Sequence, residues 1–492
     1  MADVLLIQPI VEKQETRYAP LGLLSLAAYL EPKYSVKIVD ERFEPDPKAA
    51  IQAEVGKGPI IVGVTSLTGR QIAHGLEVTR WVKEASRSVP VVWGGFHTSY
   101  FPKEAIAVDG FDFVVAKEGV STLLELVDRL AAGKTDSFKD IPGLSWKRDG
   151  VFYVNPERVF LNGEKLPTPA WHLVDVKQYA KALAPYFGAP AVDITTSRGC
   201  PFRCKFCYEL SFNNRTWRPR NADQVVREIT MLHKEYGIEF INIHDDLYIV
   251  NRKSRERALY IGRRLKEEGV KIEYTVTHRV DMFEPGFLKE MMSLGLRQVR
   301  AGVESGSPRI LKAIAKDITR EQIIESARVS AKLGLGIYYS FVIGWPDETE
   351  ADRRQTIDLA LNLIRINPKA RIYPLWIYVP YPGTPHFDEA AKHGFVMPKT
   401  MEEWSGYTWG HVNVPWIEEP ERFENLHYLS RLAFFNRPIR DIISSTSRSP
   451  WKLTAQRVGG VLSRPWAQWR LRCGGGPMPV EHRLLRPVLG EA

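Results

Sequence analysis

Cysteine is scarce in this chain, and a membrane-spanning run is absent. The 492 residues include four cysteines, Cys200, Cys204, Cys207 and Cys473, which is too few for a disulfide framework. No apolar run approaches the roughly 20 residues that span a bilayer. The N-terminal MADVLLIQPI lacks a basic segment and a small-residue cleavage site, so it predicts a first strand rather than a secretion signal. We therefore expect a cytoplasmic protein.

Excess charge of one sign is missing from most of the chain. The net charge is +9, and residues 431–492 carry nearly all of it, with eleven Lys and Arg against three acidic residues. The first 430 residues are close to neutral, which disfavours a nucleic-acid-binding surface across them. The tail combines Trp with Arg, which suits either peripheral contact with a membrane or a lid packed on the preceding domain. Gly459-Gly460 and Pro465 exclude a transmembrane helix there.

The first 140 residues alternate between two patterns. A chain of this length exceeds one hydrophobic core, so two or three domains are expected. Short apolar, β-branched runs alternate with helical patterns, which predicts an α/β, Rossmann-like, doubly wound parallel sheet with its ligand at the C-terminal strand ends. The runs are 3–7, 36–39, 60–65, 90–93 and 112–115, and the helical patterns are 20–31, 70–86 and 120–132.

A second series of strands follows a proline-rich linker at 141–190, which includes a hairpin around Asp149-Gly150. Residues 191–385 hold six strand patterns separated by helical ones, which predicts a partial (β/α)6 TIM-like barrel with its chemistry at the C-terminal strand ends. The strand patterns are 192–197, 240–245, 272–277, 298–304, 337–344 and 371–379. Residues 386–492 predict a mainly α C-terminal extension.

Three of the four cysteines form one cluster. Cys200-x3-Cys204-x2-Cys207 follows the first barrel strand, and Cys473 lies 266 residues beyond it. Thiolates bind Fe–S clusters, and three thiolates leave one iron of a [4Fe–4S] cube open. The alternatives are a zinc site completed by Cys473 or a histidine, and three unrelated cysteines. Zinc sites usually have paired cysteine knuckles, and the sequence has no second pair.

This spacing after the first strand of a partial barrel resembles the radical S-adenosylmethionine (SAM) superfamily. The resemblance implies that the open iron chelates SAM and that one electron from the cluster splits it into a 5′-deoxyadenosyl radical. It also implies that Phe206 and Gly344 lie against the adenine of SAM and that Asp245 contacts the methionine amino group. Glu304 would contact the ribose, and Ser305, the next residue, is expected in the same cofactor-binding segment.

Several of these positions have an alternative interpretation. Arg279 resembles a residue that binds the cofactor carboxylate, but a salt bridge to Asp281 or Glu304 explains an arginine at this position equally well. Asp246, beside Asp245, could instead cap the next helix. Two tyrosines, Tyr208 directly after the cysteines and Tyr378 near the last strand, are the candidate catalytic residues of the substrate cavity.

The N-terminal domain resembles the cobalamin (B12)-binding domain that precedes the barrel in one subclass of this superfamily. The matching segments include TSLTG at 65–69 and GGFHTS at 94–99, and they imply that Ser66, Thr68, Gly94 and Gly95 bind cobalamin. The Asp-x-His-x-x-Gly motif of other cobalamin proteins is absent. His97 is interpreted as a loop histidine that bonds to backbone rather than as a ligand. The fifth-strand segment KEGVST departs from the usual Gly-Glu-Gly-Glu type turn.

The overall resemblance is to the group containing the anaerobic magnesium-protoporphyrin ester cyclase and the hopanoid methylases. It implies a radical SAM enzyme that modifies an unactivated carbon of a small lipid- or tetrapyrrole-like molecule, by cobalamin-dependent C-methylation. The alternative is cobalamin-independent or oxidative radical cyclisation on an N-terminal scaffold. A reducing partner such as flavodoxin or ferredoxin is also implied. A tRNA-modifying methylthiotransferase would predict basic charge over the first 430 residues, which is missing.

Overall fold

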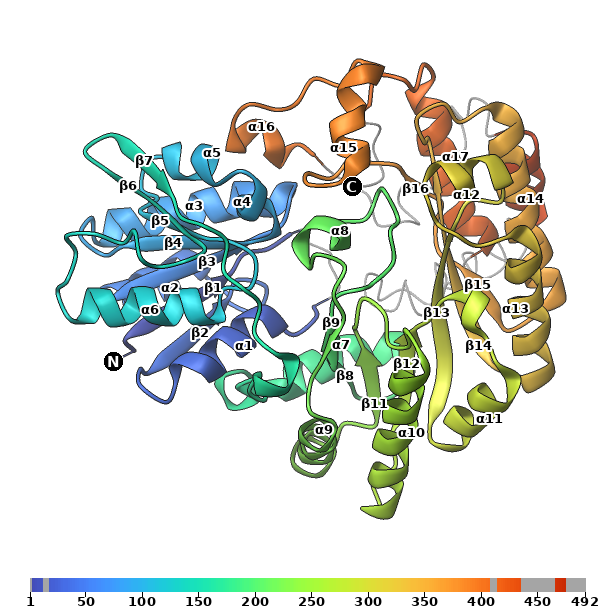
Figure 1. Cartoon of the computed structure of the whole chain (residues 1–492), viewed down its shortest axis with the longest axis horizontal. Helices are drawn as coiled ribbons and strands as arrows, with labels where there is room; N and C mark the ends of the chain where they lie inside the picture. Colours follow the sequence, from blue (N-terminus) through green and yellow to red (C-terminus); the bar gives the residue numbers. More distant parts are fainter. Residues whose placement is uncertain (1, 12–16, 408–413, 435–464, 475–492) are drawn as a thin grey trace, which may run out of the picture. The chain divides into compact units, whose positions relative to one another are not determined.

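The computed structural model describes residues 2–11, 17–407, 414–434 and 465–474 (Figure 1). Two compact units make up the fold, and each draws on three stretches of chain. The first unit contains residues 1–198, 218–242 and 396–408, and the second contains 199–217, 243–395 and 409–492.

The first unit is built on a seven-stranded sheet with the strand order β2-β1-β3-β4-β5-β6-β7. The pairs among β1 to β5 are parallel, and β6 and β7 add an antiparallel hairpin. The strands are β1 Val4–Gln8, β2 Val36–Asp40, β3 Ile61–Ser66, β4 Val91–Gly95, β5 Phe113–Val115, β6 Leu144–Arg148 and β7 Val151–Val154. β1 and β3 to β5 are buried almost throughout, as expected for strands covered on both faces.

Helices pack in pairs around this sheet, α1 against α6 and α2 against α3. Their bounds are α1 Leu21–Leu30, α2 Pro47–Val55, α3 Arg70–Ala85, α4 Phe96–Tyr100, α5 Pro102–Ala107, α6 Val120–Ala131 and α7 Val176–Phe187. Gly75 on α3 lies against the indole of Trp93, where a β-carbon would collide with the ring. Trp93 is fully buried and stacks on Phe111 with ring centroids 4.3 Å apart.

The second sheet has the strand order β15-β14-β13-β12-β11-β8, with β16 paired to β14. It forms the expected half-barrel, and the pairs from β12 to β15 are parallel. The strands are β8 Ala191–Ile194, β11 Phe240–Ile243, β12 Glu273–Thr277, β13 Leu296–Glu304, β14 Gly336–Ile343, β15 Ala370–Ile372 and β16 Trp376–Ile377. A two-residue ribbon pairs β9 Ser197–Arg198 with β10 Arg218–Pro219.

Helices α10, α11, α13 and α14 run along the outside of strands β12 to β15 (Figure 1). The helices after the cysteines are α8 Glu209–Phe212, α9 Ala222–Tyr236, α10 Arg252–Glu267, α11 Pro285–Ser293, α12 Pro308–Ala313, α13 Arg320–Leu333 and α14 Glu350–Ile366. Capping boxes start three of them, led by Asn251, Thr319 and Thr349. Each box satisfies backbone N–H groups that the helix itself leaves unpaired.

The C-terminal extension contains α15 Pro385–Ala390, α16 Met401–Ser405 and α17 Pro420–Phe434. Residues 465–472 are also helical, and Ala467 and Leu471 are buried in the barrel core while Trp469 is 58% exposed. This part of the tail matches the expected lid. The rest of the proposed membrane-contacting segment lies outside the described residues. Among the described residues, the structure has no helix that is long and apolar enough to cross a membrane.

The largest departure from the sequence prediction is the sixth barrel strand. The pattern at 371–379 predicts one strand, but Tyr373, Pro374 and Leu375 interrupt it between β15 and β16. Pro374 has no N–H for the sheet, and Leu375 donates its N–H to the Ser430 hydroxyl on α17 instead (2.8 Å). Helices α2, α4, α5 and α8, and the 12-residue α7 within the predicted linker, are also additional to the predicted ones.

Candidate active site

The three clustered cysteines lie on a loop between β9 and α8. Cys204 is buried, and Cys200 and Cys207 are half-buried. Cys473 is exposed in the turn that follows the helix at 465–472. The described residues contain no group of three His, Cys, Asp or Glu side chains that converge as ligands of a single metal ion. A [4Fe–4S] cube has no such requirement, because each thiolate binds a different iron.

The surroundings of the thiols fit a cationic cluster. Burial raises the pKa of Cys200 to about 11 and also raises the pKa of Cys207. Deprotonating these thiols therefore requires a positive charge beside them, which iron supplies. Gly199 starts the loop with φ +87°, and a β-carbon there would collide with the carbonyl of Thr216. The loop thus brings together three cysteine side chains, and no fourth ligand joins them in the part of the chain that the structure describes.

Asp246 braces this loop. One carboxylate oxygen accepts the N–H of Gly199 (2.9 Å), and the other accepts the hydroxyl of Tyr208 (3.0 Å). The alternative interpretation of Asp246 as a helix cap is wrong, because a further loop separates it from α10 and Asn251 caps that helix. Asp245 is buried, 2% exposed, beside it. Tyr208 is 36% exposed, and burial of its hydroxyl beside Asp246 raises its pKa.

Phe206 belongs to an aromatic wall. Its ring meets Trp345 edge to face with centroids 5.1 Å apart, and Trp345 in turn lies 4.8 Å from Tyr378. Tyr378 is 3% exposed, and its hydroxyl is buried without a hydrogen-bond partner among the described residues. Burial raises the pKa of Tyr378. The two predicted aromatic positions therefore share one cluster.

Glu304 ends β13 in an unusual conformation. The parallel ladder with β14 shifts register between Gly302 and Glu304, and Glu304 has φ +70°, a region that non-glycine residues rarely adopt. Its carboxylate accepts a hydrogen bond from the ammonium of Lys316 (3.0 Å). Burial works to lower the pKa of Lys316, but the charges of Glu304 and Cys204 outweigh it and raise that pKa.

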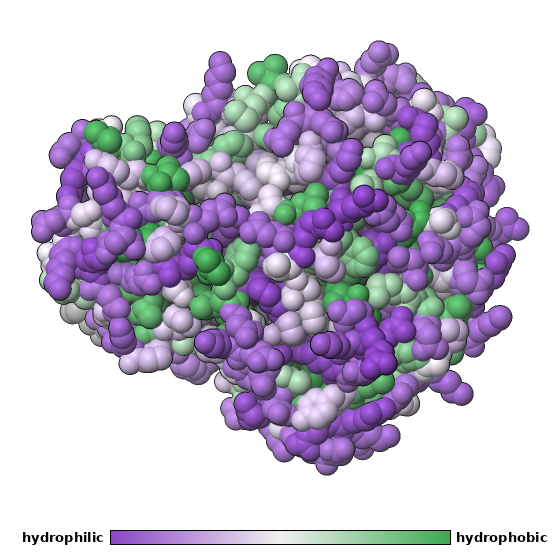
Figure 2. Space-filling view, viewed as in Figure 1, coloured by the Kyte–Doolittle hydropathy of each residue, from purple (hydrophilic) through white to green (hydrophobic). Residues whose placement is uncertain are grey.

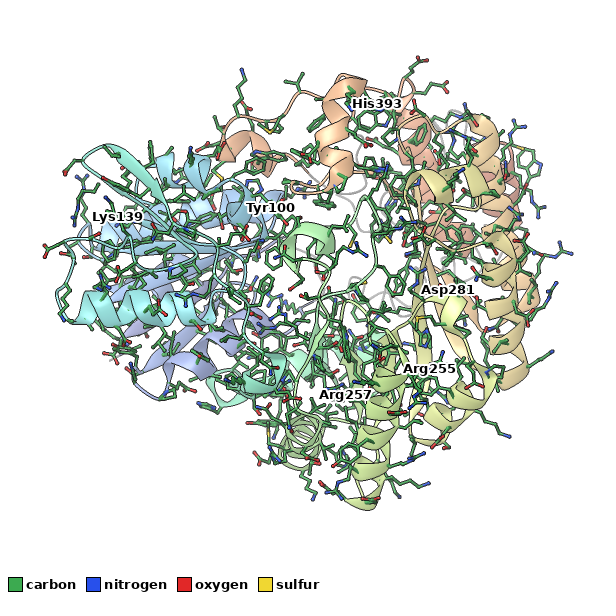
Figure 3. The ribbon with its side chains drawn as sticks, in the orientation of Figure 1. Tyr100, Lys139, Arg255, Arg257, Asp281 and His393 are labelled. Carbon is green, nitrogen blue, oxygen red and sulfur yellow. The ribbon has the colours of Figure 1, made fainter. Side chains whose placement is uncertain are left out.

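Arg279 forms the salt bridge that the sequence left as an alternative. Its guanidinium forks onto Asp281, with N–O distances of 2.9 and 3.0 Å, and it also donates to the carbonyls of Lys316 and Asp317. Figure 3 labels Asp281 in the barrel. The guanidinium carbon also lies 3.9 Å from the ring centroid of Phe202. Arg279 thus ties β12 to the cysteine loop and to the turn at 314–318.

Ser305 and Gly344 lie at neighbouring strand ends. Ser305 is fully buried, and its hydroxyl lies 3.1 Å from that of Thr356 on α14. Gly344 has φ +80°, and a β-carbon there would lie 2.7 Å from Ile417. Its N–H donates to the buried carboxylate of Glu348 (2.8 Å), whose pKa burial raises to about 7. Both positions are therefore tightly packed.

The expected cobalamin positions lie at the C-terminal ends of β3 and β4 in the first unit. Gly95 has φ +107°, and a β-carbon on it would collide with the backbone of Ser66. The hydroxyl of Ser66 donates to the carbonyl of Gly94 (3.2 Å). Gly69 also has φ +107°, and a β-carbon there would lie 2.5 Å from the carbonyl oxygen of Tyr407. Both glycines therefore allow the protein's own backbone segments to pack closely at the edge of the sheet where a ligand is expected.

His97 and Thr68 pair at the same edge. His97 lies on α4 rather than in a loop, and its Nδ1 is 3.0 Å from the Thr68 hydroxyl. The interpretation of His97 as a loop histidine bonded to backbone is therefore wrong. Its Nε2 is buried and has no hydrogen-bond partner among the described residues, and burial lowers the pKa of His97 to about 3. A neutral imidazole packs here against Trp404 of α16.

Two protein-family models match this chain, one over the N-terminal domain and one over the barrel. A B12 binding domain model matches residues 7–127, and a radical SAM superfamily model matches residues 194–360. The chain is 36% identical over 414 residues to the uncharacterized methyltransferase PH0819 of Pyrococcus horikoshii, covering 82% of this chain and 86% of that protein. Hopanoid C-2 methylase of Rhodopseudomonas palustris is 24% identical over 75% of this chain and 65% of that protein.

Two solved structures share the fold. The cobalamin-dependent SAM radical enzyme OxsB aligns with a TM-score of 0.75 and 18% identity, over 99% of this chain and 74% of that one. The radical SAM methyltransferase TsrM of Kitasatospora setae aligns with a TM-score of 0.68 and 21% identity, over 80% of this chain and 76% of that one. At these identities the likeness concerns the fold.

The half-barrel and its three-cysteine loop define a radical SAM enzyme. The chain belongs to the radical SAM superfamily, in the subclass that carries a B12 binding domain ahead of the barrel. An anaerobic magnesium-protoporphyrin IX monomethyl ester cyclase of Synechocystis is also a relative, 30% identical over 47% of this chain and 46% of that protein. The resemblance to the cyclase and hopanoid methylase group is thereby confirmed.

The sequence interpretation missed Lys316 and the part played by Asp246. Lys316 sits in a short polar stretch between two helices, which looks like an exposed turn. The signal that could have found it is its position between Ile314 and Ile318, both of which are buried. A lysine enclosed by two buried isoleucines in a turn has little room to reach solvent.

Proposed function

We propose that the protein is a cobalamin-dependent radical SAM enzyme that methylates an unactivated carbon of a small molecule. The observation that carries this proposal is the presence of two separate cofactor platforms in one chain. Three clustered thiols, with no fourth protein ligand among the described residues, lie in one unit, and the C-terminal ends of β3 and β4, where such a sheet binds its ligand, lie in the other. The 36% identity with a methyltransferase over most of the chain supports the same reaction.

Three sets of residues would bind the three cofactors. Cys200, Cys204 and Cys207 would hold the cluster, and Ser66, Thr68, Gly94 and Gly95 would hold cobalamin. Phe206, Asp245, Glu304, Ser305 and Gly344 would contact SAM. When bound, these groups supply a hydrogen-abstracting radical and a methyl donor.

The aromatic wall keeps water away from the reacting carbon. Trp345 and Tyr378 are 2% and 3% exposed, so a substrate carbon beside them would be shielded from solvent. The hydroxyl of Tyr378 has no hydrogen-bond partner among the described residues, so it can donate to a polar group of the substrate. Tyr208, held by Asp246, is the second candidate for substrate contact.

Oxidative cyclisation without cobalamin is the second candidate function, and Glu118 favours it. This residue belongs to the KEGVST segment, which differs from the Gly-Glu-Gly-Glu type turn usual in the subclass. Its carboxylate forms ion pairs with Arg198 and Arg218, the latter at 2.9 Å. Charges from both arginines overcome the effect of burial and lower the pKa of Glu118. An ion-paired strand end is less open to a corrinoid than a glycine-rich turn is.

One experiment separates the two functions. The anaerobically reconstituted protein is incubated with methyl-deuterated SAM, a reductant and a lipid and tetrapyrrole extract of host cells lacking the gene. Methylation yields a deuterated product, S-adenosylhomocysteine and 5′-deoxyadenosine, whereas cyclisation yields 5′-deoxyadenosine without S-adenosylhomocysteine. Absence of bound corrinoid after reconstitution with cobalamin would overturn the methylation proposal.

The substrate and partners follow from the same proposal. Relatives named for a bacteriochlorophyllide and for hopanoids support a tetrapyrrole- or lipid-like substrate. Flavodoxin or ferredoxin would supply electrons to the cluster. On the face shown in Figure 2, hydrophilic residues predominate and hydrophobic ones form separate small patches.

A further inference from the structure

His97 is a fully buried residue whose ring the assignments above leave without a purpose. It lies on α4, just after the C-terminal end of β4. Its Nε2 has no hydrogen-bond partner among the described residues. A buried polar atom in this state costs free energy, so an apolar side chain would be more favourable here unless the ring has another task. The other ring nitrogen, Nδ1, shows what that task is.

Nδ1 of His97 holds the hydroxyl of Thr68, and the two atoms are 3.0 Å apart. Thr68 is half-buried in residues 67–69, the β3 loop, which joins β3 to α3 at the edge of the sheet where a ligand is expected. A threonine hydroxyl has one donor and two acceptor positions, so this bond leaves hydrogen-bonding capacity for a ligand. Because burial lowers the pKa of His97 to about 3, the ring stays neutral at physiological pH.

The rest of the β3 loop is fixed on both sides of Thr68. Gln71, which is buried, accepts the N–H of Leu67 (2.7 Å). On the other side, Gly69 lies so close to Tyr407 that a β-carbon would come within 2.5 Å of its carbonyl oxygen. The hydroxyl of Thr68 is therefore presented from a loop whose backbone is already held in place.

The C-terminal extension holds His97 in turn. The ring of His97 lies edge to face against Trp404 of α16, with centroids 5.2 Å apart, and Phe101 lies at the same distance. Trp404 is fully buried, and α16 packs on α3. Trp404 and Tyr407 both belong to residues 396–408, which cluster with the first unit. One segment of the extension thus supports the β3 loop at two points.

We propose that His97 is a positioning residue of the cobalamin site, which fixes the Thr68 hydroxyl for a hydrogen bond to a carboxamide of cobalamin. Carboxamides on the rim of the corrin ring offer both N–H donors and carbonyl acceptors, so a hydroxyl can pair with them in either role. A hydroxyl that is already oriented loses less conformational freedom on binding and so contributes more affinity. Trp404 supports the site by holding His97. This inference rests on the proposed cobalamin-dependent function and adds the histidine and the C-terminal segment to its machinery.

The test measures the affinity for hydroxocobalamin of the full-length, cluster-containing protein without SAM or substrate. His97→Phe keeps a ring against Trp404 but loses the bond to Thr68, and Thr68→Val loses the hydroxyl. Each should weaken binding by about three- to tenfold, the usual effect of one hydrogen bond. The double variant should match the single variants within about twofold, because both changes remove the same bond. Equilibrium dialysis, read by the absorbance of cobalamin, gives the dissociation constants.

Two further variants separate the hydrogen bond from packing. His97→Asn keeps a polar atom near the place of Nδ1 but leaves a gap beside Trp404, so it should lower the unfolding temperature and retain most of the affinity. His97→Phe should show the reverse order, and poor folding of one variant cannot produce that pattern. Thr98→Val is the matched control, because the buried hydroxyl of Thr98 has no hydrogen-bond partner among the described residues, and it should leave the affinity unchanged.

The outcomes distinguish this inference from the function on which it rests. Unchanged affinity in His97→Phe, or losses that multiply in the double variant, would overturn the positioning role alone. So would a loss in Thr98→Val as large as that in Thr68→Val, because any change in this part of the unit would then disturb binding. Failure of the unaltered protein to bind cobalamin would overturn the proposed function as well.

Discussion

Glu41, directly after β2, is a buried carboxylic acid. It is 4% exposed and accepts the N–H of Ile10 (2.8 Å), and burial raises its pKa to about 7. A raised folded-state pKa favours the protonated acid, so its stabilising effect is complete below the ordinary pKa of 4.5 and is lost as pH rises through about 7. We expect Glu41→Gln to raise the free energy of unfolding by about 2–3 kcal/mol at pH 8.5 and to have little effect at pH 4.5.

Glu54 supplies the matched control in the same unit. Hydrogen bonds from Lys37 and Lys57 lower its pKa, so its stabilising effect is present above the ordinary value of 4.5 and is lost as pH falls. Glu54→Gln should therefore decrease the free energy of unfolding at neutral pH. Urea titrations at several pH values measure both. If Glu41→Gln destabilised the protein at pH 8.5, the buried acid would be ionised without cost.

At the residue scale, the sequence predicts those side chains whose chemistry is carried by spacing. The three cysteines are of this kind, because ligands of one cluster come close together in the chain. The roles of Lys316 and Asp246 could not be predicted from spacing, because only the fold brings their partners Glu304 and Gly199 close to them. Arg279 shows the converse, since sequence cannot decide between Asp281 and a cofactor when both are within reach.

The cysteine loop is an element that one carboxylate holds at both ends. Asp246 accepts hydrogen bonds from Gly199 at one end of the loop and from Tyr208 at the other. We expect Asp246→Ala to weaken iron retention by about 10- to 100-fold, as loss of a supporting hydrogen bond does at other metal sites. Iron and sulfide analysis after gel filtration measures this. Tyr208→Phe removes one of the two bonds and should retain more iron than Asp246→Ala.

The end of β4 is the element on which cobalamin binding should depend. Gly95→Ala places a methyl group against the backbone of Ser66 at φ +107°, so we expect a loss of about 1–3 kcal/mol in stability and weaker cobalamin retention. Absorbance of bound cobalamin after desalting reports the second effect. Gly133→Ala has a positive φ of +65° but no atom within 4 Å, so it isolates the conformational cost and should leave cobalamin bound.

Elements were predictable where local chemistry defines them. Thr349 caps α14 and Asp149-Gly150 turns the β6–β7 hairpin, as their sequences indicate. The break between β15 and β16 could not be predicted from the sequence, because the acceptor for the N–H of Leu375 is Ser430, 55 residues away. The same holds for the bulge at Glu304, which depends on β14.

For the whole molecule, the two cofactor platforms should be separable. The cysteines and the Gly69 and Gly95 edge belong to different compact units. We expect the triple variant Cys200→Ala, Cys204→Ala, Cys207→Ala to lose its iron and to retain cobalamin, since no thiol takes part in the first unit. Parallel iron and corrinoid analysis of one preparation measures this. Loss of both cofactors together would show that the platforms are coupled.

At this scale the order of the two sheets along the chain was predictable from alternating strand and helix patterns. The composition of the compact units was not. Residues 218–242 and 396–408 cluster with the first unit, although the former lie between barrel strands in the sequence and the latter follow the last one. Packing such as that of Trp404 against His97 joins positions about 300 residues apart, and no local pattern encodes it.

This division of the chain has a consequence for synthesis on the ribosome. The polypeptide passes from one unit to the other after residues 198, 217, 242, 395 and 408. The first unit therefore lacks its last segment, which includes Trp404, until most of the chain has emerged. Nascent domains usually fold in order from the N-terminus. Here α16 can pack on the sheet that emerges first only after the barrel strands have been synthesised, so the first unit is completed late in translation.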